Sequence, residues 1–167
     1  MEKISLVKYT DAYYIYAKEC SPTKLPLHEA YGYVTKTHDA LLVEFIKLSQ
    51  VGNQKKENVN IVKGLIIPVQ ALISNSNHFV INNLNDLTQQ SKVVITWSDV
   101  VYLANVSRKN VSIMRSEGIL EKNENDHIVL SQPKTFRIKP LPEERHPEKD
   151  PDYYVIPKSL ILTVKTI

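Results

Sequence analysis

The sequence predicts an all-β protein made of two tandem small β-barrels, related by an internal duplication, with short helical turns. The first observation is that short runs rich in β-branched and aromatic residues are separated by turn residues, which is typical of small sandwiches and barrels. The second observation is that one pattern occurs twice. Blocks at residues 8–11, 32–36 and 66–68 return in the same order 86 to 89 residues later. A repeat close to half the chain length indicates two tandem copies of one fold.

The repeated blocks carry the same residue at matching steps. The matched pairs are Asp11 with Asp99, Gly32 with Gly118, and Pro68 with Pro157. The small drift in their spacing is what loop-length changes between two copies produce. We therefore expect one domain at 1–81, a polar Asn-rich linker at 82–91 and a second domain at 92–167.

The first copy has five apolar or β-branched runs. They predict strands at residues 4–9, 31–36, 40–48, 59–67 and 79–81. The run at 68–72 begins with a proline and predicts a single helical turn rather than more strand. Residues 12–19 hold three tyrosines, and they predict either an irregular hairpin or a short helix.

The second copy follows the same plan. It predicts strands at residues 93–97, 117–122, 127–130, 136–139, 153–157 and 160–167. Residues 123–126 are polar and predict a turn, and the proline-rich, charged stretch at 140–152 predicts an exposed loop. Residues 99–114 are ambiguous in the same way as 12–19, and they predict either a hairpin or helical structure.

Composition is that of an ordinary globular protein. The chain has 167 residues, 43% of them hydrophobic and 23% charged, with a net charge of +3. This mild positive charge is compatible with nucleic acid or an acidic partner and requires neither. No apolar run approaches the roughly 20 residues that span a bilayer, so we expect no membrane partner. Cys20 is the single cysteine, which excludes an internal disulfide and favours a reducing, cytoplasmic setting.

Two segments carry a resemblance to a known fold family. Residues 9–13 (Tyr-Thr-Asp-Ala-Tyr) resemble the strand that opens the RT loop of SH3 domains, and residues 64–72 resemble the segment that leads into their closing 3₁₀ turn. The chain is similar to SH3-like barrels over most of 3–75 and more weakly over 93–167. It also resembles small uncharacterised proteins of phages and mobile elements that carry one such copy. The resemblance implies the barrel.

The resemblance does not extend to proline-rich peptide binding. Peptide-binding SH3 domains use paired tryptophans and a tyrosine after the closing turn, which line the groove for the ligand. This chain has one tryptophan. The expected tyrosine is replaced by Ala71 or Leu72 in the first copy and by Leu160 or Ile161 in the second.

The candidate partner-binding residues follow the repeated aspartates. They are Asp11, Tyr13, Tyr16, Asp99 and Tyr102. An acid beside an exposed ring, present in both copies, is one interpretation, and the other is that each Asp is a turn residue that accepts hydrogen bonds from backbone N–H groups. Exposed tyrosines are favoured at interfaces.

We therefore predict a non-enzymatic protein-binding module, encoded by a phage or similar element and acting on a host or viral protein. Long loops at 49–58 and 140–152 would complete its contact surface, because loops on a rigid barrel are where such folds carry function. The sequence is also compatible with a homo-oligomer.

The alternative prediction is a DNA-binding regulator with a winged helix-turn-helix in residues 96–131. Ser107 would cap the recognition helix, and the residues that meet DNA would be Arg108, Lys109, Asn110 and Arg115. The repeat opposes this alternative. The first copy has prolines at 22 and 26 in the matching region, and a homologous pair of helices cannot form there.

Catalytic and metal sites are not predicted. The five histidines show no metal-ligand spacing with one another, with Cys20 or with paired carboxylates. Cys20 has no nearby histidine that would activate it as a nucleophile. We expect no enzyme activity, no cofactor and no metal ion.

Overall fold

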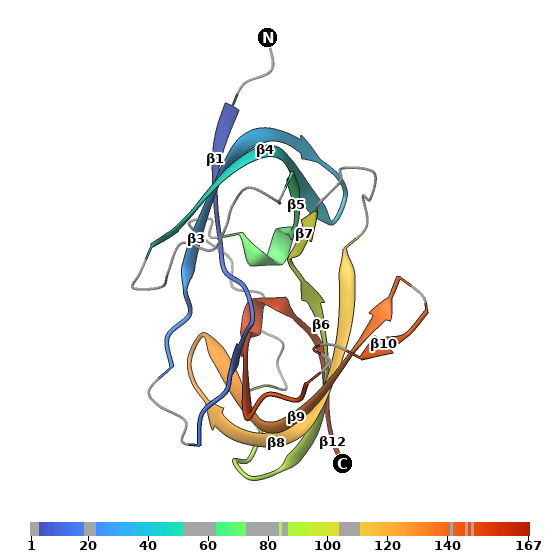
Figure 1. The fold of residues 1–167 in the computed structure, drawn as a ribbon. Helices are drawn as coiled ribbons and strands as arrows, with labels where there is room; N and C mark the ends of the chain where they lie inside the picture. Colours follow the sequence, from blue (N-terminus) through green and yellow to red (C-terminus); the bar gives the residue numbers. More distant parts are fainter. Residues whose placement is uncertain are drawn as a thin grey trace. The chain divides into compact units, whose positions relative to one another are not determined.

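The computed structural model is built from antiparallel β-strands and two short 3₁₀ turns (Figure 1). It describes residues 4–18, 23–51, 63–72, 84, 87–103, 111–140, 142–145, 147 and 149–167. The predicted all-β class is confirmed. None of the helices in this part of the chain is long and apolar enough to cross a membrane.

The chain forms two compact units, and neither is one continuous stretch of sequence. Unit 1 contains residues 1–11, 26–76 and 99–111, and unit 2 contains 12–25, 77–98 and 112–167. The residues of the two units therefore differ from those of the predicted domains 1–81 and 92–167 in two segments. Residues 12–25 belong to the second unit and residues 99–111 to the first.

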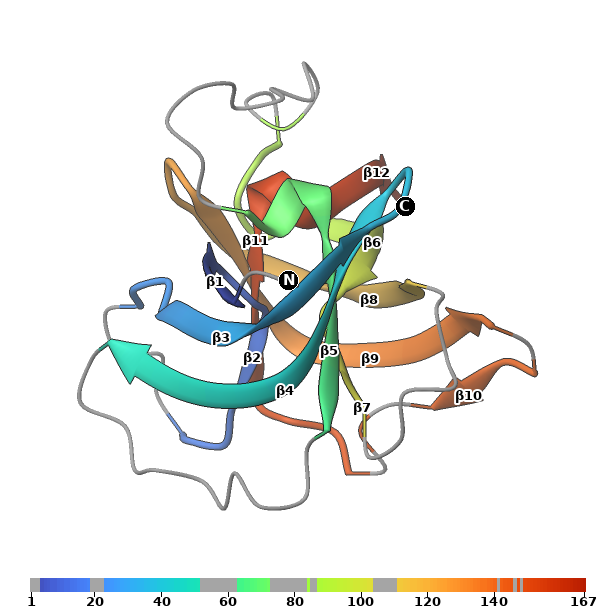
Figure 2. The ribbon, with the colours of Figure 1, turned by 90° about the horizontal axis from the view of Figure 1, so that it is seen from above.

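Unit 1 holds a five-stranded sheet with the order β1-β3-β4-β5-β7. Its strands are β1 (Ile4–Tyr9), β3 (Leu27–Lys36), β4 (Ala40–Val51), β5 (Gly64–Pro68) and β7 (Val101–Leu103). Figure 2 shows the long β3–β4 hairpin and the turn η1 (Val69–Ala71) that follows β5. Every residue of β5 is buried. Pro68 ends that strand and is the N-cap residue of the turn, which begins at Val69, so the single helical turn lies within the predicted run 68–72.

Gly32 permits the close approach of β3 and β4. A Cβ atom there would lie 2.3 Å from the carbonyl oxygen of Glu44 and 2.8 Å from a methyl carbon of Val43. The register between the strands shifts at this point, between Tyr31 and Tyr33. The glycine thus occupies an irregularity where any side chain would collide with the neighbouring strand.

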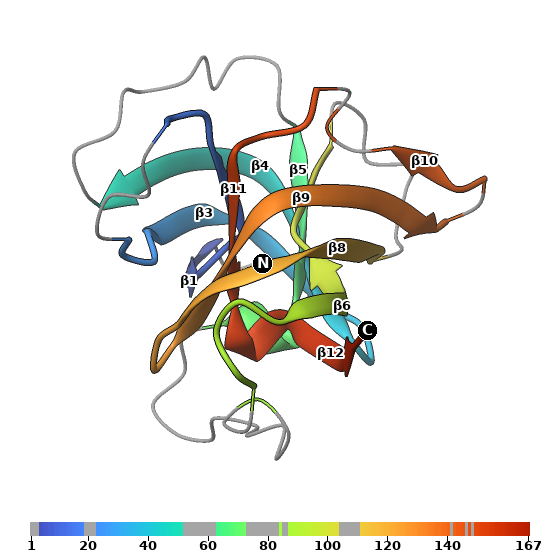
Figure 3. The same cartoon turned by 90° about the horizontal axis from the view of Figure 1, so that it is seen from below.

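Unit 2 holds a larger sheet with the order β12-β6-β8-β9-β11-β2, and β10 pairs with β9. Its strands are β2 (Tyr13–Ile15), β6 (Lys92–Asp99), β8 (Ser112–Asn123), β9 (His127–Lys139), β10 (Glu144–Arg145), β11 (Tyr153–Pro157) and β12 (Ile161–Thr166). Figure 3 shows the long β8–β9 hairpin with β10 beside its end. The turn η2 (Lys158–Leu160) joins β11 to β12. The two predicted strands at 127–130 and 136–139 are one strand, β9.

The core of unit 2 contains a buried polar chain. Trp97 is fully buried, and its Nε1–H donates a hydrogen bond of 3.0 Å to Oγ of Ser116. Oγ of Ser116 lies 2.8 Å from the hydroxyl of Thr135. The rings of Trp97 and Tyr154 meet edge to face at 5.4 Å. Each polar side chain in the series Trp97–Ser116–Thr135 thus has a hydrogen-bond partner, which is what burial of such groups requires.

The two units share one strand plan, as the repeated sequence blocks predict. In unit 1 the strand β5 leads into η1, and β7 pairs with β5; in unit 2 the strand β11 leads into η2, and β2 pairs with β11. Neither sheet closes on itself among the described residues. The structure therefore shows two open antiparallel sheets of the same design.

The helical interpretation of the ambiguous segments is wrong wherever these residues are described. Residues 13–15, 101–103 and 112–115 are strand, because each segment pairs with a neighbouring strand of its sheet and tertiary pairing overrides weak local preference. The helix pair predicted for 100–115 is therefore absent from these parts. Residues 104–110, including Arg108, Lys109 and Asn110, lie outside the described residues, as do 79–83 and 85–86, the last of which belong to the predicted linker.

Candidate functional site

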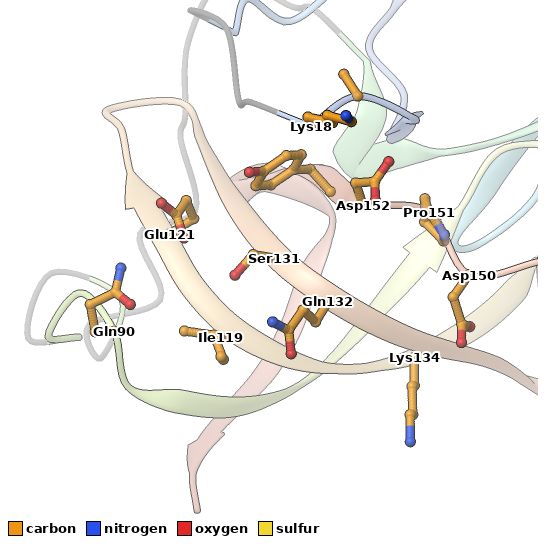
Figure 4. A pocket seen from close by; sticks show the side chains of 12 residues that line it. Lys18, Gln90, Ile119, Glu121, Ser131, Gln132, Lys134, Asp150, Pro151 and Asp152 are labelled. Carbon is orange, nitrogen blue, oxygen red and sulfur yellow. The ribbon is translucent and has the colours of Figure 1, made fainter.

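A polar cavity of about 580 Å³ opens on unit 2. Its walls come from β8, β9, the approach to β11 and the segment after β2, as Figure 4 shows. The lining residues are Ala17, Lys18, Gln90, Ile119, Glu121, Ser131, Gln132, Lys134, Asp150, Pro151, Asp152 and Tyr153.

Two glutamines of this cavity have left-handed backbone. The φ angle is 66° at Gln90 and 49° at Gln132, a region that residues other than glycine rarely adopt. Hydrogen bonds hold both backbones in place: the N–H of Gln90 donates to the carbonyl of Leu120 at 2.8 Å, and the N–H of Gln132 donates to the carbonyl of Asp152 at 3.0 Å. Such backbone persists where its surroundings fix it, and it is concentrated at functional sites.

The cavity carries charges of both signs. Its cations are Lys18 and Lys134, and its carboxylates are Glu121, Asp150 and Asp152. Asp150 also forms an ion pair with Arg145 on β10. A wall that mixes charges and amides does not create the single-sign field that steers nucleic acid. It suits a ligand that presents donors and acceptors together.

Two tyrosines precede the cavity residues Ala17 and Lys18 in the sequence. Tyr14 packs on Tyr154 of β11, with ring centroids 4.3 Å apart and hydroxyl oxygens 3.2 Å apart. Tyr16 is 54% exposed, and its hydroxyl donates a hydrogen bond of 3.3 Å to the carbonyl of Lys149. The ammonium of Lys149 lies 5.9 Å from the centre of the Tyr16 ring, within the range of a cation–π contact. A large, wet aromatic ring is thus held against residues that neighbour the cavity wall.

The predicted site residues fall into two groups. Tyr13 and Tyr16 are in unit 2. Tyr16 contacts Lys149 of the predicted loop 140–152, whereas the hydroxyl of Tyr13 donates to the carbonyl of Lys24 at 3.3 Å. Asp11, Asp99 and Tyr102 are in unit 1 and do not line it. The side chain of Tyr102 and most of the loop 49–58 lie outside the described residues.

The two repeated aspartates are withdrawn from solvent to different degrees. Asp11 is buried. The carboxylate of Asp99 accepts a hydrogen bond from the backbone N–H of Val100, which lowers its pKa, but desolvation by burial is the larger effect and raises the pKa to about 7. The residue as a whole keeps part of its surface accessible, while its carboxyl group is desolvated. Neither aspartate presents an open acidic group beside the tyrosines.

Arg115, the described residue of the predicted DNA-contacting set, is engaged within unit 2. Its guanidinium lies 2.6 Å from a carboxylate oxygen of Glu143 and 4.0 Å from one of Glu117. It also lies 5.4 Å from the centre of the Phe136 ring. These contacts give the side chain a role in linking the β8–β9 hairpin to the loop that follows.

Sequence reasoning missed a hydroxyl–imidazole–carboxylate chain in unit 2. The hydroxyl of Thr23 lies 2.6 Å from Nε2 of His127, and Nδ1 of the same ring lies 2.6 Å from a carboxylate oxygen of Asp126. Thr23 and His127 are 104 positions apart, and no local signal connects them.

This order of groups is the one used in nucleophilic catalysis, but its setting differs. His127 is 3% exposed, and none of the three residues lines the cavity. Thr23 and Asp126 therefore provide hydrogen-bond partners for both nitrogens of the buried His127 ring, and the contact with Thr23 holds the segment after β2 in place.

Comparisons with known proteins add nothing to the geometry of this site. A search of family models, one of curated proteins and one of solved structures each give no match. Among the described residues, no group of three or more histidine, cysteine, aspartate or glutamate side chains is placed to hold a metal ion.

Proposed function

We propose that the chain is a non-enzymatic protein-binding module that acts through the tyrosine face of unit 2. We define this face as Tyr16, Lys149 and the cavity lined by their sequence neighbours Ala17, Lys18 and Asp150; Tyr13, on the same segment, is proposed as a further contact. The observation that carries the proposal is the exposed ring of Tyr16, 54% accessible and held by Lys149. Tyrosine has few rotatable bonds and an amphipathic side chain, and it is enriched among the residues that dominate interface energies.

The cavity favours a peptide segment over a ligand of one charge. The amides of Gln90 and Gln132 both donate and accept hydrogen bonds, and lysines and carboxylates stand among them. A protein segment in extended form presents backbone N–H and C=O groups of the same kinds. The fixed backbone at both glutamines keeps these groups in place before binding, which reduces the entropy lost in the complex.

The proposal includes the architecture that positions this face. We propose that each unit is an SH3-like barrel, supported by the way each sheet is joined end to end. In unit 2 the strands β11 and β12 are consecutive through η2, although β12 lies at the far end of the sheet and pairs with β6. In unit 1 Leu72, directly after η1, bridges to Tyr9 of β1. A sheet linked in this way has to curl. The cytoplasmic setting and the phage origin stay predictions from the sequence.

The test compares three forms of the full chain as bait in affinity capture. They are the wild type, Tyr16→Ser, and the matched control Tyr31→Ser, which removes an exposed tyrosine from β3 of unit 1. We expect a protein retained by the wild type and the control and lost with Tyr16→Ser. With that protein purified, Tyr16→Ser should weaken the affinity at least tenfold, since hot-spot residues contribute about 2 kcal/mol or more. Equal capture by all three forms would refute the proposed face.

A further inference from the structure

We propose that the outer edges of β5 and β11 are strand-binding sites, each specific for the segment that follows the repeated aspartate of the other repeat. The occupant of the β11 edge is β2, and the occupant of the β5 edge is β7. It follows that the two repeats bind each other as separate chains, without a covalent linker.

The two edges accept their strands in the same register. On β11, Tyr14 lies opposite Tyr154 and Tyr13 opposite Val155. On β5, Tyr102 lies opposite Leu65, and Val101 lies opposite Ile66. The bound strands β2 and β7 are 88 positions apart in the sequence. The strands that bind them, β5 and β11, are 89 positions apart, and both spacings are those of the sequence repeat. A reciprocal exchange of one strand between two copies of a fold produces this identity of register.

A second contact recurs where each segment rejoins its host sheet. In unit 2, Thr23 meets His127 at 2.6 Å. In unit 1, Val111 packs against a buried cluster that includes Ala40. Val111 stands 88 positions after Thr23, and His127 stands 87 positions after Ala40. The same place in the fold is thus a hydrogen bond in one unit and an apolar contact in the other.

This difference gives each edge a preference for its own segment. A valine against the imidazole of His127 would leave a buried nitrogen without its partner, and a threonine among the apolar residues around Ala40 would bury a hydroxyl in an apolar site. Both mismatches cost free energy. The exchange is therefore directed, and each repeat recognises the other rather than a second copy of itself.

The two exchanged segments also begin at corresponding positions of the two repeats. The first exchanged segment leaves unit 1 after Asp11, and the second leaves unit 2 after Ser98, at the step to Asp99. These are the aspartates that first mark the repeat. Asp99 fixes the local backbone by accepting the N–H of Val100.

The experiment uses the full chain with a protease recognition sequence inserted between Thr88 and Gln89, both exposed. After cleavage, we expect the two pieces to co-elute as a 1:1 complex in size-exclusion chromatography with light scattering. Tyr14→Pro removes an N–H from β2 and breaks that strand, and it should abolish co-elution of the cleaved form. The matched control is Lys18→Pro, at an exposed position beyond β2, which should leave the complex intact. Spontaneous separation of the wild-type pieces, or equal retention by Tyr14→Pro, would overturn the proposal.

A cross-link keeps the test decisive even where the proline variant does not fold. Tyr13→Cys and Val155→Cys, with Cys20→Ser, place two thiols at directly opposed positions of β2 and β11, within reach of a disulfide. Because these positions lie on different pieces after cleavage, oxidised protein should run as one covalently joined species under denaturing, non-reducing conditions. Reduction should resolve it into two. Two separate bands before reduction would also overturn the proposal.

Discussion

Replacing Asp99 with asparagine should change how the stability of the protein depends on pH. Burial raises the pKa of Asp99 from 3.8 to about 7 in the folded protein. In the unfolded chain the group has its ordinary pKa, so between pH 4 and pH 7 the folded state binds a proton that the unfolded state releases. The contribution of Asp99 to stability therefore falls as pH rises through this window. Asparagine stays neutral, and its side-chain oxygen still accepts the N–H of Val100.

The magnitude follows from the two pKa values. A pKa difference of one corresponds to 1.36 kcal/mol, so the full rise at Asp99 corresponds to an upper limit of about 4 kcal/mol above pH 7. Between pH 5 and pH 8 the group loses about 3 kcal/mol of that amount. Asp99→Asn should therefore gain about 3 kcal/mol in free energy of unfolding relative to the wild type when the pH is raised from 5 to 8.

The assay is urea unfolding followed by tryptophan fluorescence at pH 5, 6, 7 and 8. Trp97 is buried in the core of unit 2, and circular dichroism reports both sheets. The matched control is Asp39→Asn, an exposed aspartate in the β3–β4 turn, which should follow the wild type at every pH. A constant difference between Asp99→Asn and the wild type from pH 5 to pH 8 would show that the carboxyl is not desolvated in the folded protein.

Four further substitutions test the packing. Ser116→Ala leaves the buried Nε1–H of Trp97 without its acceptor and should cost about 1–3 kcal/mol in urea unfolding; the same substitution should cost less in a Trp97→Phe background, where no N–H is left without an acceptor. Gly32→Ala should cost about 3 kcal/mol or more, because the new methyl would lie 2.3 Å from a carbonyl oxygen. Gly118→Ala, where the distance is 3.0 Å, should cost less, and an equal or reversed order of melting temperatures contradicts the geometry. Thr23→Val removes the hydroxyl facing a buried imidazole and should cost about 1–3 kcal/mol; an unchanged midpoint would show that the hydrogen bond contributes nothing.

Much of the fold could be predicted from local sequence. The strands β1 and β11 and the turn η1 lie where their residues predict them, since β-branched runs and Pro68 act locally. The strands β2 and β7 could not be predicted in this way. Each has three residues, and each is strand because of a partner far along the chain. Tyr14 and Tyr154, for example, are 140 positions apart.

The candidate site was only partly predictable, for a related reason. An exposed tyrosine beside a charged loop can be anticipated from composition, and Tyr16 and the loop residues of the cavity meet that expectation. The left-handed backbone at Gln90 and Gln132 carries no signal in the side chain, because glutamine does not favour that conformation. Thr23 and His127 meet only through the folded sheet.

The pairing of β2 with β11 has a consequence for synthesis on the ribosome. Residues 13–15 are translated well before their partner, residues 153–157; Tyr14 and Tyr154, for example, are 140 positions apart. Two tyrosines and an isoleucine must therefore wait, unpaired, until the residues between the two strands have been translated. A chaperone that shields early apolar segments should hold this stretch longest, and stalling upstream of residue 153 should leave a product prone to aggregation.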